Sequence, residues 1–577
     1  RLAMTVNNTD TFLVERSGTS YKLQAQNLMA DLQDADLMLV ERSGTSYKAT
    51  GLDIKNSLGS DQPTLKATAS GAISNGDACV LNSNGTVSAI SSTVLTESAT
   101  DIGADLTTYN DKDPSPIVYD PATGRIIAVR DDSAQIRVRV GRFNSGSTAI
   151  TWGSWQQAYS AGQRNIKQYR SAAYWDDNSN QLLVFFMHNS GASDNKMRLI
   201  VRSFNSSDQV QGTAGDDYSF SGNYPNPYQR PTILRATVDP TRFHIFWQKQ
   251  AGSNYDLWVN TYTVGANSVS RPGERQIHYD YNYAASIDPY GNIVVCLPTN
   301  NDLRTFTTKT NSAKTSVDNL SSSVNISPLS NDPSGSSNDV RLAWDSGNQG
   351  FWITARYFQY QWSNYARNTY IGFFKINAGG APFMVAAGDK FFDGMDPSYH
   401  LTYHAPSRSV IAAYGGGATS EASIVMKYRR AYLDSNGNIA TTSAFTPNLH
   451  NGTTTKGARS IDASLYIPSI KKFLTFHIDV TNQGLSHFDR DINLYQPGYE
   501  DSNLTTSNYL GIADGSAANN TDAKVIVYPG VAGGQSGLTT GTKYYVQLDG
   551  TLDTTADDIV QVAGTAQSAS TIKVQYS

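Results

Sequence analysis

One pattern recurs seven times between residues 105 and 504, and it constrains the fold of this chain more than any other feature. In each copy an aromatic or apolar segment leads into a turn, and a strongly apolar segment follows. The turns of the first five copies carry an aspartate, namely Asp120, Asp176, Asp239, Asp288 and Asp345. In the last two copies Ala405-Pro406 and Ile467-Pro468 stand at the turn instead. A repeat of about 50–60 residues with several strands in each copy is typical of a β-propeller.

The repeat therefore predicts an all-β chain in which residues 105–504 form a seven-bladed β-propeller, although the pattern also admits six or eight blades. The seventh copy is short, because little strand-like sequence follows residues 485–494. We expect the segment 94–102, which precedes the propeller, to supply the missing strand and close the ring. Closure would leave only short, protected sheet edges.

The segments on either side of the propeller share a different pattern, in which short strands alternate with tight turns. Asn75-Gly76 and Asn84-Gly85 mark tight turns between short strands, and residues 538–552 alternate apolar and polar side chains. We predict that residues 61–104 and 505–577 are two parts of one small β domain, into which the propeller is inserted. Two separate small domains would give a similar sequence.

The first 60 residues contain a tandem repeat, since residues 14–22 return unchanged as residues 40–48. Each copy predicts a hairpin with a Ser-Gly-Thr turn, followed by a short amphipathic helix at 26–32 or 52–58. Two such ββα modules are too small to bury much apolar surface alone, so we expect them to pack on each other or on a partner. The candidate attachment residues are Phe12, Val14, Tyr21, Leu37, Leu39 and Tyr47.

Charge and cysteine content exclude several classes of protein. The 45 Lys and Arg residues nearly balance the 50 Asp and Glu residues, so the chain lacks the general positive charge of a nucleic-acid binder. No run of about 18 apolar residues is present, so no membrane span is expected. The two cysteines, Cys79 and Cys296, belong to different predicted domains, and we expect both to be reduced.

The sequence offers no strong catalytic or cofactor motif. It has no Gly-x-x-x-x-Gly-Lys-Ser/Thr phosphate loop and no Gly-x-Ser-x-Gly nucleophile elbow. His400 and His404 would share a face of a strand, but no third metal ligand accompanies them. A glycosidase needs a pair of carboxyl groups, and the only glutamates of the propeller are Glu274, Glu421 and Glu500. We expect no catalytic, cofactor or metal residue, and we expect the turn aspartates to cap their own turns.

Clusters of aromatic residues are the candidate contact sites for a glycan or a protein. Such residues among adaptable polar neighbours suit sugar stacking or protein contact, and packing between blades is the alternative for each cluster. The cluster around residues 358–365 lies in an Asn/Gln/Ser-rich stretch that we interpret as a long insertion. The clusters are Phe358, Tyr360, Trp362 and Tyr365; Tyr279, Tyr281 and Tyr283; and Tyr224 and Tyr228.

Both ends of the chain resemble a known class of protein. The repeats at 10–22 and 36–48 are similar to the N-terminal modules of tail-associated structural proteins of bacteriophages, notably marine cyanophages. Residues 72–77 and 535–552 resemble the same class. The resemblance implies a virion tail protein that is assembled in the cytoplasm of the infected host, where thiols stay reduced.

This resemblance leaves three functions open. In the first, the chain is a fibre-like tail protein that attaches through its N-terminal modules and presents the propeller to the host surface. In the second, it is a purely architectural tail component resembling a nozzle, or a capsid-decorating component. In the third, it is a glycan-degrading enzyme. The expected partners are other tail proteins and copies of the same chain, in a trimer for a fibre or a hexamer for a nozzle.

Overall fold

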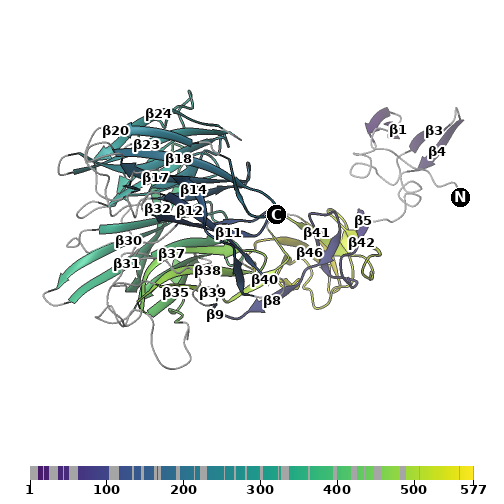
Figure 1. Ribbon diagram of the computed structural model, residues 1–577. Helices are drawn as coiled ribbons and strands as arrows, with labels where there is room; N and C mark the ends of the chain where they lie inside the picture. Colours follow the sequence, from purple (N-terminus) through teal and green to yellow (C-terminus); the bar gives the residue numbers. More distant parts are fainter. Residues whose placement is uncertain are drawn as a thin grey trace. The chain divides into compact units, whose positions relative to one another are not determined.

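A computed structural model gives the structure of this chain (Figure 1). It describes residues 11–575 apart from gaps, of which the longer ones are 25–36, 51–62, 103–115, 221–230, 326–336, 417–424, 447–456 and 481–488. All elements in the described part are β-strands. Within that part no helix is long and apolar enough to cross a membrane. Two compact units are present, one comprising Leu95–Tyr499 and the other Arg1–Val94 together with Glu500–Ser577.

Seven antiparallel sheets follow one another along the described part of the unit Leu95–Tyr499, and six of them contain only strands that are consecutive in the chain. The first three contain β10 (Ile117–Asp120), β11 (Arg125–Asp132), β12 (Gln135–Phe143), β13 (Ile150–Trp152) and β14 (Gln156–Ser160); β15 (Asn165–Ile166), β16 (Ala172–Asp176), β17 (Gln181–Asn189), β18 (Asn195–Phe204), β19 (Val210–Gln211) and β20 (Gly215–Phe220); and β21 (Thr232–Arg235), β22 (Arg242–Ala251), β23 (Asn254–Gly265) and β24 (Ser268–Tyr279).

The other four sheets contain β25 (Ala284–Ile287), β26 (Ile293–Pro298), β27 (Leu303–Thr308) and β28 (Val324–Asn325); β29 (Ser337–Asp345), β30 (Gly350–Gln361), β31 (Asn364–Ile376) and β32 (Pro382–Asp393); β33 (Tyr399–His404), β34 (Ser409–Gly416), β35 (Val425–Leu433) and β36 (Ile439–Thr441); and β37 (Gly457–Ile467), β38 (Lys472–Val480), β39 (Asp489–Gln496) and β9 (Ser98–Asp101).

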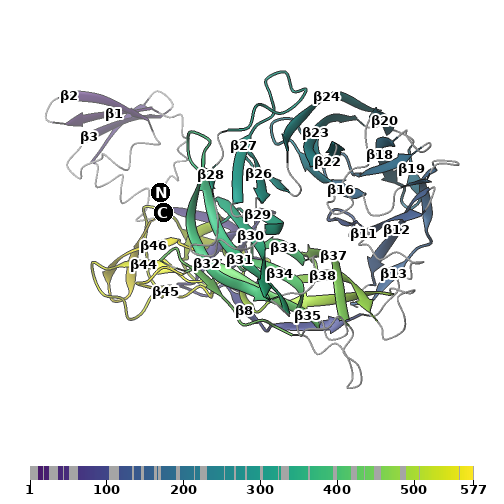
Figure 2. The same cartoon turned by 90° about the vertical axis from the view of Figure 1, so that its left-hand side faces the viewer.

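These sheets surround a common centre (Figure 2). The innermost strands contact one another in the order β10, β16, β21, β25, β29, β33 and β37, and β37 contacts β10 again. Since each sheet packs between two others, its second strand is apolar on both faces. In β17, for example, every residue from Leu182 to Phe186 is fully buried. The predicted all-β propeller fold is confirmed.

The ring is closed by a strand from the other end of the unit, as the short seventh repeat predicts. The strand β9 pairs antiparallel with β39, with Asp101 opposite Asn493 and Ser98 opposite Gln496. The seventh sheet thereby reaches four strands, three from the C-terminal side of the ring and one from its N-terminal side. Next to this closure, β8 (Ser92–Leu95) and β40 (Tyr499–Ser502) form a two-stranded sheet.

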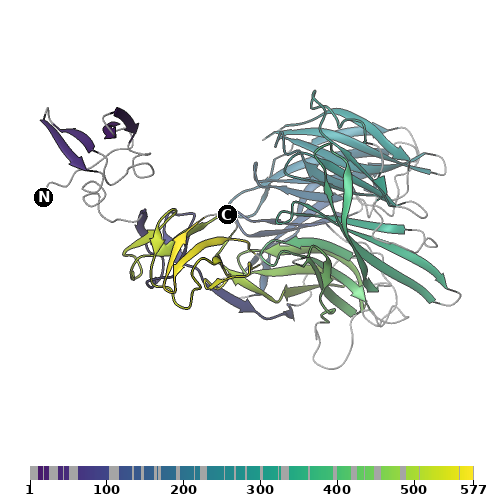
Figure 3. The same cartoon turned by 180° about the vertical axis from the view of Figure 1, so that it is seen from behind.

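The flanking segments form one β domain, so the propeller is an insertion within it. The first sheet of this domain joins β5 (Thr64–Thr68), β6 (Ala78–Leu81) and β7 (Val87–Ala89) to the late strands β41 (Tyr509–Ala513) and β42 (Asp522–Ile526). The second sheet contains β43 (Val531–Ala532), β44 (Lys543–Val546), β45 (Leu552–Asp553), β46 (Val562–Ser568) and β47 (Thr571–Val574). One core joins the two sheets, with Val80 and Ile512 from the first and Ile572 from the second. Figure 3 shows early strands in purple among late strands in yellow.

The N-terminal repeat folds into two hairpins that share one sheet. The strands β1 (Thr11–Arg16) and β2 (Thr19–Gln24) pair antiparallel, and so do β3 (Leu37–Arg42) and β4 (Thr45–Thr50). Pairing of β1 with β3 gives the order β2-β1-β3-β4, so the two copies pack on each other as expected. The helices predicted at 26–32 and 52–58 lie outside the described residues.

Both cysteines are free and buried, which confirms the prediction of two reduced thiols. Burial, with a smaller contribution from the Asp77 carboxylate, raises the pKa of the Cys79 thiol to about 12. Burial also raises the pKa of the Cys296 thiol to about 12. Cys79 belongs to the split domain and Cys296 to the ring, so the two are in different units.

Candidate ligand site

An open pocket of about 630 Å³ lies within the ring, and its wall comes from six of the seven innermost strands and the residues beside them. Aromatic side chains dominate this wall. They are Tyr119, Tyr174, Trp175, Trp344, Tyr403 and Tyr466. We call this cavity the central pocket. Because its volume falls within the range of about 300–1,000 Å³ found for small-molecule sites, it is large enough for a ligand.

Five of these aromatic residues occupy the same position in their sheets. Each one directly precedes the last residue of an inner strand, and that last residue pairs across the turn with the start of the second strand. The five are Tyr119, Trp175, Trp344, Tyr403 and Tyr466. A single position of the repeat therefore supplies five of the six Tyr and Trp residues that line the pocket.

The turn residues hold this geometry in place. Asp120 Oδ1 accepts the backbone N–H of Ala122 at 3.0 Å, and Asp288 Oδ1 accepts those of Tyr290 and Asn292 at 2.9 and 2.7 Å. Asp176, Asp239 and Asp345 also accept backbone N–H groups from their own turns. The prediction that the turn aspartates cap the backbone is confirmed.

The third sheet departs from the aromatic pattern. Its inner strand β21 ends at Arg235, whose guanidinium lies 2.9 Å from Asp176 and 2.6 Å from Asp177 of the second sheet. Arg235 is not among the residues that line the pocket. Within the described part of the chain, the pocket wall contains no Asp, Glu, Lys or Arg side chain.

The polar groups of the wall are mainly hydroxyls. Ser286, Ser346 and Thr402 contribute aliphatic hydroxyls beside the tyrosine phenols, and Thr402 Oγ1 donates to the carbonyl of Ser464 at 3.1 Å. Burial raises the pKa of Tyr174 above its ordinary value, so this phenol stays neutral in the physiological range. The indole Nε1 atoms of Trp175 and Trp344 are buried and have no hydrogen-bond partner among the described residues.

The two histidines do not form a metal pair. His400 lines the pocket, with Nδ1 3.1 Å from Thr402 Oγ1. His404 is fully buried, packs against Tyr466, Phe473 and Tyr499, and has Nδ1 2.6 Å from Ser407 Oγ. Among the described residues no group of three or more His, Cys, Asp or Glu side chains could hold a metal ion.

The glutamates considered for catalysis are not part of the central pocket as described. Glu274 pairs with Arg271 at 3.0 Å on the third sheet, and Glu500 bonds to the hydroxyl of Ser92. Glu421 lies outside the described residues. The described wall therefore contains no carboxyl pair for glycoside cleavage.

One candidate contact residue is wrong. Tyr283 is buried, with 1% of its surface exposed, and its hydroxyl donates to the carbonyl of Phe246 at 2.7 Å. The alternation of Tyr279, Tyr281 and Tyr283 predicts a shared strand face. Instead, β24 ends at Tyr279 and Tyr283 directly precedes β25, so the period of two does not apply across this connection.

The stretch around Phe358 belongs to a hairpin, which corrects its interpretation as an inserted loop. The strands β30 and β31 continue to Gln361 and from Asn364, and Tyr360 is paired with Tyr365 in the backbone register. Trp362 lies outside the described residues, as do Tyr281, Tyr224 and Tyr228. For Tyr279, Phe358, Tyr360 and Tyr365 the structure describes the backbone only, and the same holds for the six candidate attachment residues in β1–β4.

The aromatic wall was missed among the contact sites expected from the sequence, although its signal is visible there. Tyr119, Trp175 and Trp344 each stand directly before a turn aspartate. The sequence of an aromatic residue followed by aspartate was interpreted only as a sign of the repeat. An aromatic residue that keeps its place in a ring repeat also points to a site at the ring centre.

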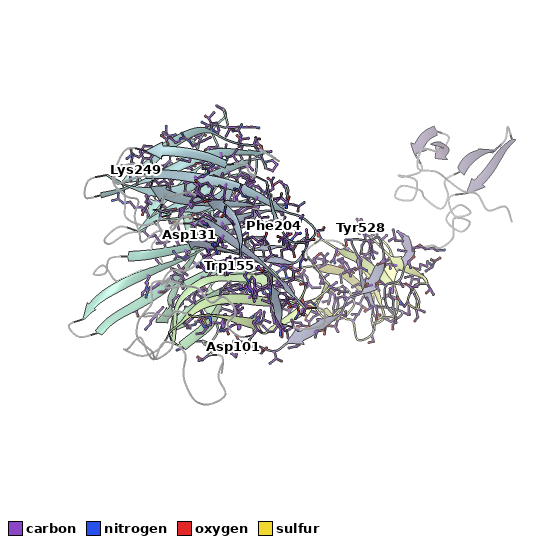
Figure 4. The ribbon with its side chains drawn as sticks, viewed as in Figure 1. Asp101, Asp131, Trp155, Phe204, Lys249 and Tyr528 are labelled. Carbon is purple, nitrogen blue, oxygen red and sulfur yellow. The ribbon has the colours of Figure 1, made fainter. Side chains whose placement is uncertain are left out.

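The first and second sheets are joined by a charged contact away from this pocket. Asp208 Oδ1 lies 2.7 Å from Arg125 Nε, and Asp208 Oδ2 lies 2.7 Å from Arg142 Nε. The guanidinium of Arg125 also lies over the ring of Phe204, 5.8 Å from its centre; Phe204 is labelled in Figure 4. Hydrogen bonding from Arg142 is the main reason that the pKa of Asp208 falls to about 2.

No family model matches the sequence, and no curated protein matches it. Among solved structures, a protein from Lactobacillus plantarum is 12% identical with a TM-score of 0.41, over 67% of this chain and 97% of that one. The Dos1 propeller is 10% identical with a TM-score of 0.35, over 68% and 95% of the two chains. The CNH domain of AfRom2 is 10% identical with a TM-score of 0.34, over 70% and 99%.

Proposed function

We propose that this chain is a structural protein of a bacteriophage tail, and that its propeller contacts the surface of the host cell. The sequences of the N-terminal repeat and of both flanking segments support this proposal, because they resemble tail-associated virion proteins. The structural observation that carries it furthest is the insertion of the ring into a split domain.

Two neighbouring passages of backbone connect the ring to the rest of the chain. The strands β8 and β40 pair with each other, and β9 pairs with β39 inside the ring. The chain therefore enters and leaves the ring through two segments that are paired with each other. This arrangement suits a virion protein that must carry a binding surface outside the particle.

Attachment to the tail is assigned to the N-terminal sheet. Its order β2-β1-β3-β4 places β2 and β4 at the two edges, and a sheet edge is a template for pairing with another chain. We propose that this sheet engages other tail proteins or copies of the same chain, in a trimer or a hexamer.

We propose binding rather than catalysis for the propeller. The described wall of the central pocket has aromatic and hydroxyl groups and lacks the carboxyl pair that glycoside hydrolysis requires. A purified preparation that released reducing ends from host polysaccharide would contradict this part of the proposal.

The test is adsorption of the fluorescently labelled full chain to host cells, together with immunogold labelling of virions. The proposal expects saturable adsorption and label on the tail. Replacing Tyr360, near the end of β30, together with Trp362 by Ala is expected to weaken adsorption about tenfold or more. The matched control replaces Tyr290 and Tyr528 by Ala, which are 66% and 54% exposed.

The outcomes separate the alternatives. Label on the tail without adsorption would replace the receptor-binding function by a purely architectural one. Absence of label from virions would overturn the proposal as a whole. If the control variant loses adsorption as strongly as the variant at Tyr360 and Trp362, these two residues are not the contact site.

A further inference from the structure

The central pocket has the chemistry of a site for an uncharged sugar, and we infer that it binds a neutral saccharide. This inference deepens the proposed function, and it depends on that function only for the source of the sugar, which would be the host surface. It assigns the ligand to the ring centre, away from the aromatic clusters expected from the sequence.

The wall of the pocket matches the two kinds of surface on a sugar ring. A pyranose presents patches of C–H groups on its faces and hydroxyls around its edge. Aromatic rings provide amphipathic, rigid contact surfaces for the former, and the partly exposed Tyr119, Tyr174 and Trp344 come from three different sheets. Hydroxyl groups can both donate and accept hydrogen bonds, as the sugar edge requires, and Ser286, Ser346 and the tyrosines supply them.

The absence of Asp, Glu, Lys and Arg from the described wall favours a neutral ligand. An anionic sugar that enters a pocket without a cation loses hydration with no compensating partner. The guanidinium of Arg235, at the end of the third inner strand, is held by Asp176 and Asp177. The carboxylate of Asp345 is also occupied, because it accepts bonds from Asn348 and from Trp352 Nε1, each at 2.9 Å. Both groups therefore already have partners of their own within the protein.

The direct test is calorimetric titration of the full chain with neutral oligosaccharides of glucose, galactose, mannose and N-acetylglucosamine, with sialyllactose as the anionic probe. Saturable binding of at least one neutral probe is expected, with a change in tryptophan fluorescence because Trp175 and Trp344 line the pocket. Binding of none of the neutral probes, or preference for sialyllactose over all of them, would overturn the inference.

Two variants locate the binding. Ser346 is exposed at the rim, so Ser346→Trp places an indole in the pocket without removing a core contact, and a loss of affinity of at least tenfold is expected. Ser206→Trp, in an exposed turn away from the pocket, is its matched control and should bind as the unmodified chain does. The double change Tyr119→Phe and Tyr174→Phe keeps the rings, and the loss of two hydroxyls should weaken binding about fivefold or more.

The inference and the proposed function can fail separately. If the unmodified chain adsorbs to host cells while Ser346→Trp adsorbs equally well and binds the neutral probes equally well, the pocket inference fails and the proposed function stands. If the unmodified chain binds a neutral saccharide in a manner that Ser346→Trp abolishes, yet adsorbs to no host cell, the pocket inference stands and the receptor function fails.

Discussion

The hydroxyl of Tyr495 donates a hydrogen bond of 2.5 Å to the carboxylate of Glu97, and the two residues are 398 positions apart in the sequence. Tyr495 lies on β39, and Glu97 directly precedes β9, so the bond secures the strand pair that closes the ring. The Tyr495 ring also stacks on Tyr428 of the sixth sheet, with centroids 3.9 Å apart. Burial raises the pKa of Tyr495 far above its ordinary value, and the Glu97 carboxylate adds to the shift.

We expect Tyr495→Phe to lower the free energy of unfolding of the ring by about 1–3 kcal/mol, because it removes the donor to a carboxylate and keeps the stacked ring. Thermal or urea unfolding measures the change. Tyr432→Phe, at a tyrosine that is 39% exposed, is the control and should have little effect. Equal stability of the two variants would show that the bond does not secure the closure.

Removal of the carboxylate of Asp208 is expected to weaken the contact between the first and second sheets. The side chain of Arg125 is only 9% exposed, so Asp208→Ala leaves a largely buried cation with fewer partners. We expect the free energy of unfolding to fall by about 2–4 kcal/mol. The pair of Lys524 and Asp514 has a shorter contact of 2.6 Å but is more exposed, so Asp514→Ala should cost less than about 1 kcal/mol. Equal losses of unfolding free energy in the two variants, measured by calorimetry, would contradict this expectation.

The two Asn-Gly turns of the split domain are expected to respond differently to alanine. Gly76 and Gly85 have φ of +90° and +81°, so both substitutions carry backbone strain of about 1–3 kcal/mol. A Cβ at Gly76 would also lie 2.5 Å from the carbonyl oxygen of Gly534, whereas a Cβ at Gly85 meets nothing within 4 Å. Urea unfolding should therefore show a larger loss for Gly76→Ala, and a larger loss for Gly85→Ala would contradict this packing.

Two buried histidines should make the ring less stable in mild acid. Burial, with a smaller effect of Arg242, lowers the pKa of His244 from 6.5 to about 4, and burial with Arg430 lowers that of His404 from 6.5 to about 3. The unfolded chain therefore binds more protons than the folded chain below pH 6.5. The stabilisation is complete above this value and is lost as the pH falls toward the folded pKa values.

The measurement compares the free energy of unfolding at pH 7.5 and pH 5. Each histidine should account for about 2 kcal/mol of the difference, since one pKa unit corresponds to about 1.4 kcal/mol. His244→Gln should reduce the difference by that amount. An unchanged difference in this variant would mean that His244 titrates normally in the folded chain.

The thiols should be protected in the folded protein. Because burial raises the pKa of both Cys79 and Cys296 to about 12, little thiolate exists at pH 8 and no reagent has access to it. A disulfide reagent should modify no cysteine of the native chain within minutes and both after unfolding in denaturant. Recovery of fewer than two thiols from the unfolded chain would indicate a bridge or an oxidised residue.

The sequence predicts the propeller well, because its signals are local and repeated. The runs Leu182–Phe186 and Ile293–Val295 are apolar on both strand faces and follow a turn in each copy, which identifies strands buried between sheets. The closing strand was also predictable, since the seventh repeat lacks an outer strand and the preceding segment can supply one.

The central pocket was harder to predict, because it depends on the closure of the ring. Tyr119, Trp344 and Tyr466 are far apart in the sequence, and nothing near any one of them shows that they line the same cavity. The error at Tyr283 has a different origin, since a local period of two was extended across the end of a strand.

The pairing of β9 with β39 can form only late in the synthesis of the chain. At about 5–20 residues per second, the ribosome needs roughly 20–80 s to pass from Glu97 to Tyr495, which are 398 residues apart. Throughout this interval β9 has left the ribosome before the strand that it must meet. A nascent chain that ends before residue 489 lacks β39 altogether, so an interrupted translation product cannot close its ring by this pairing.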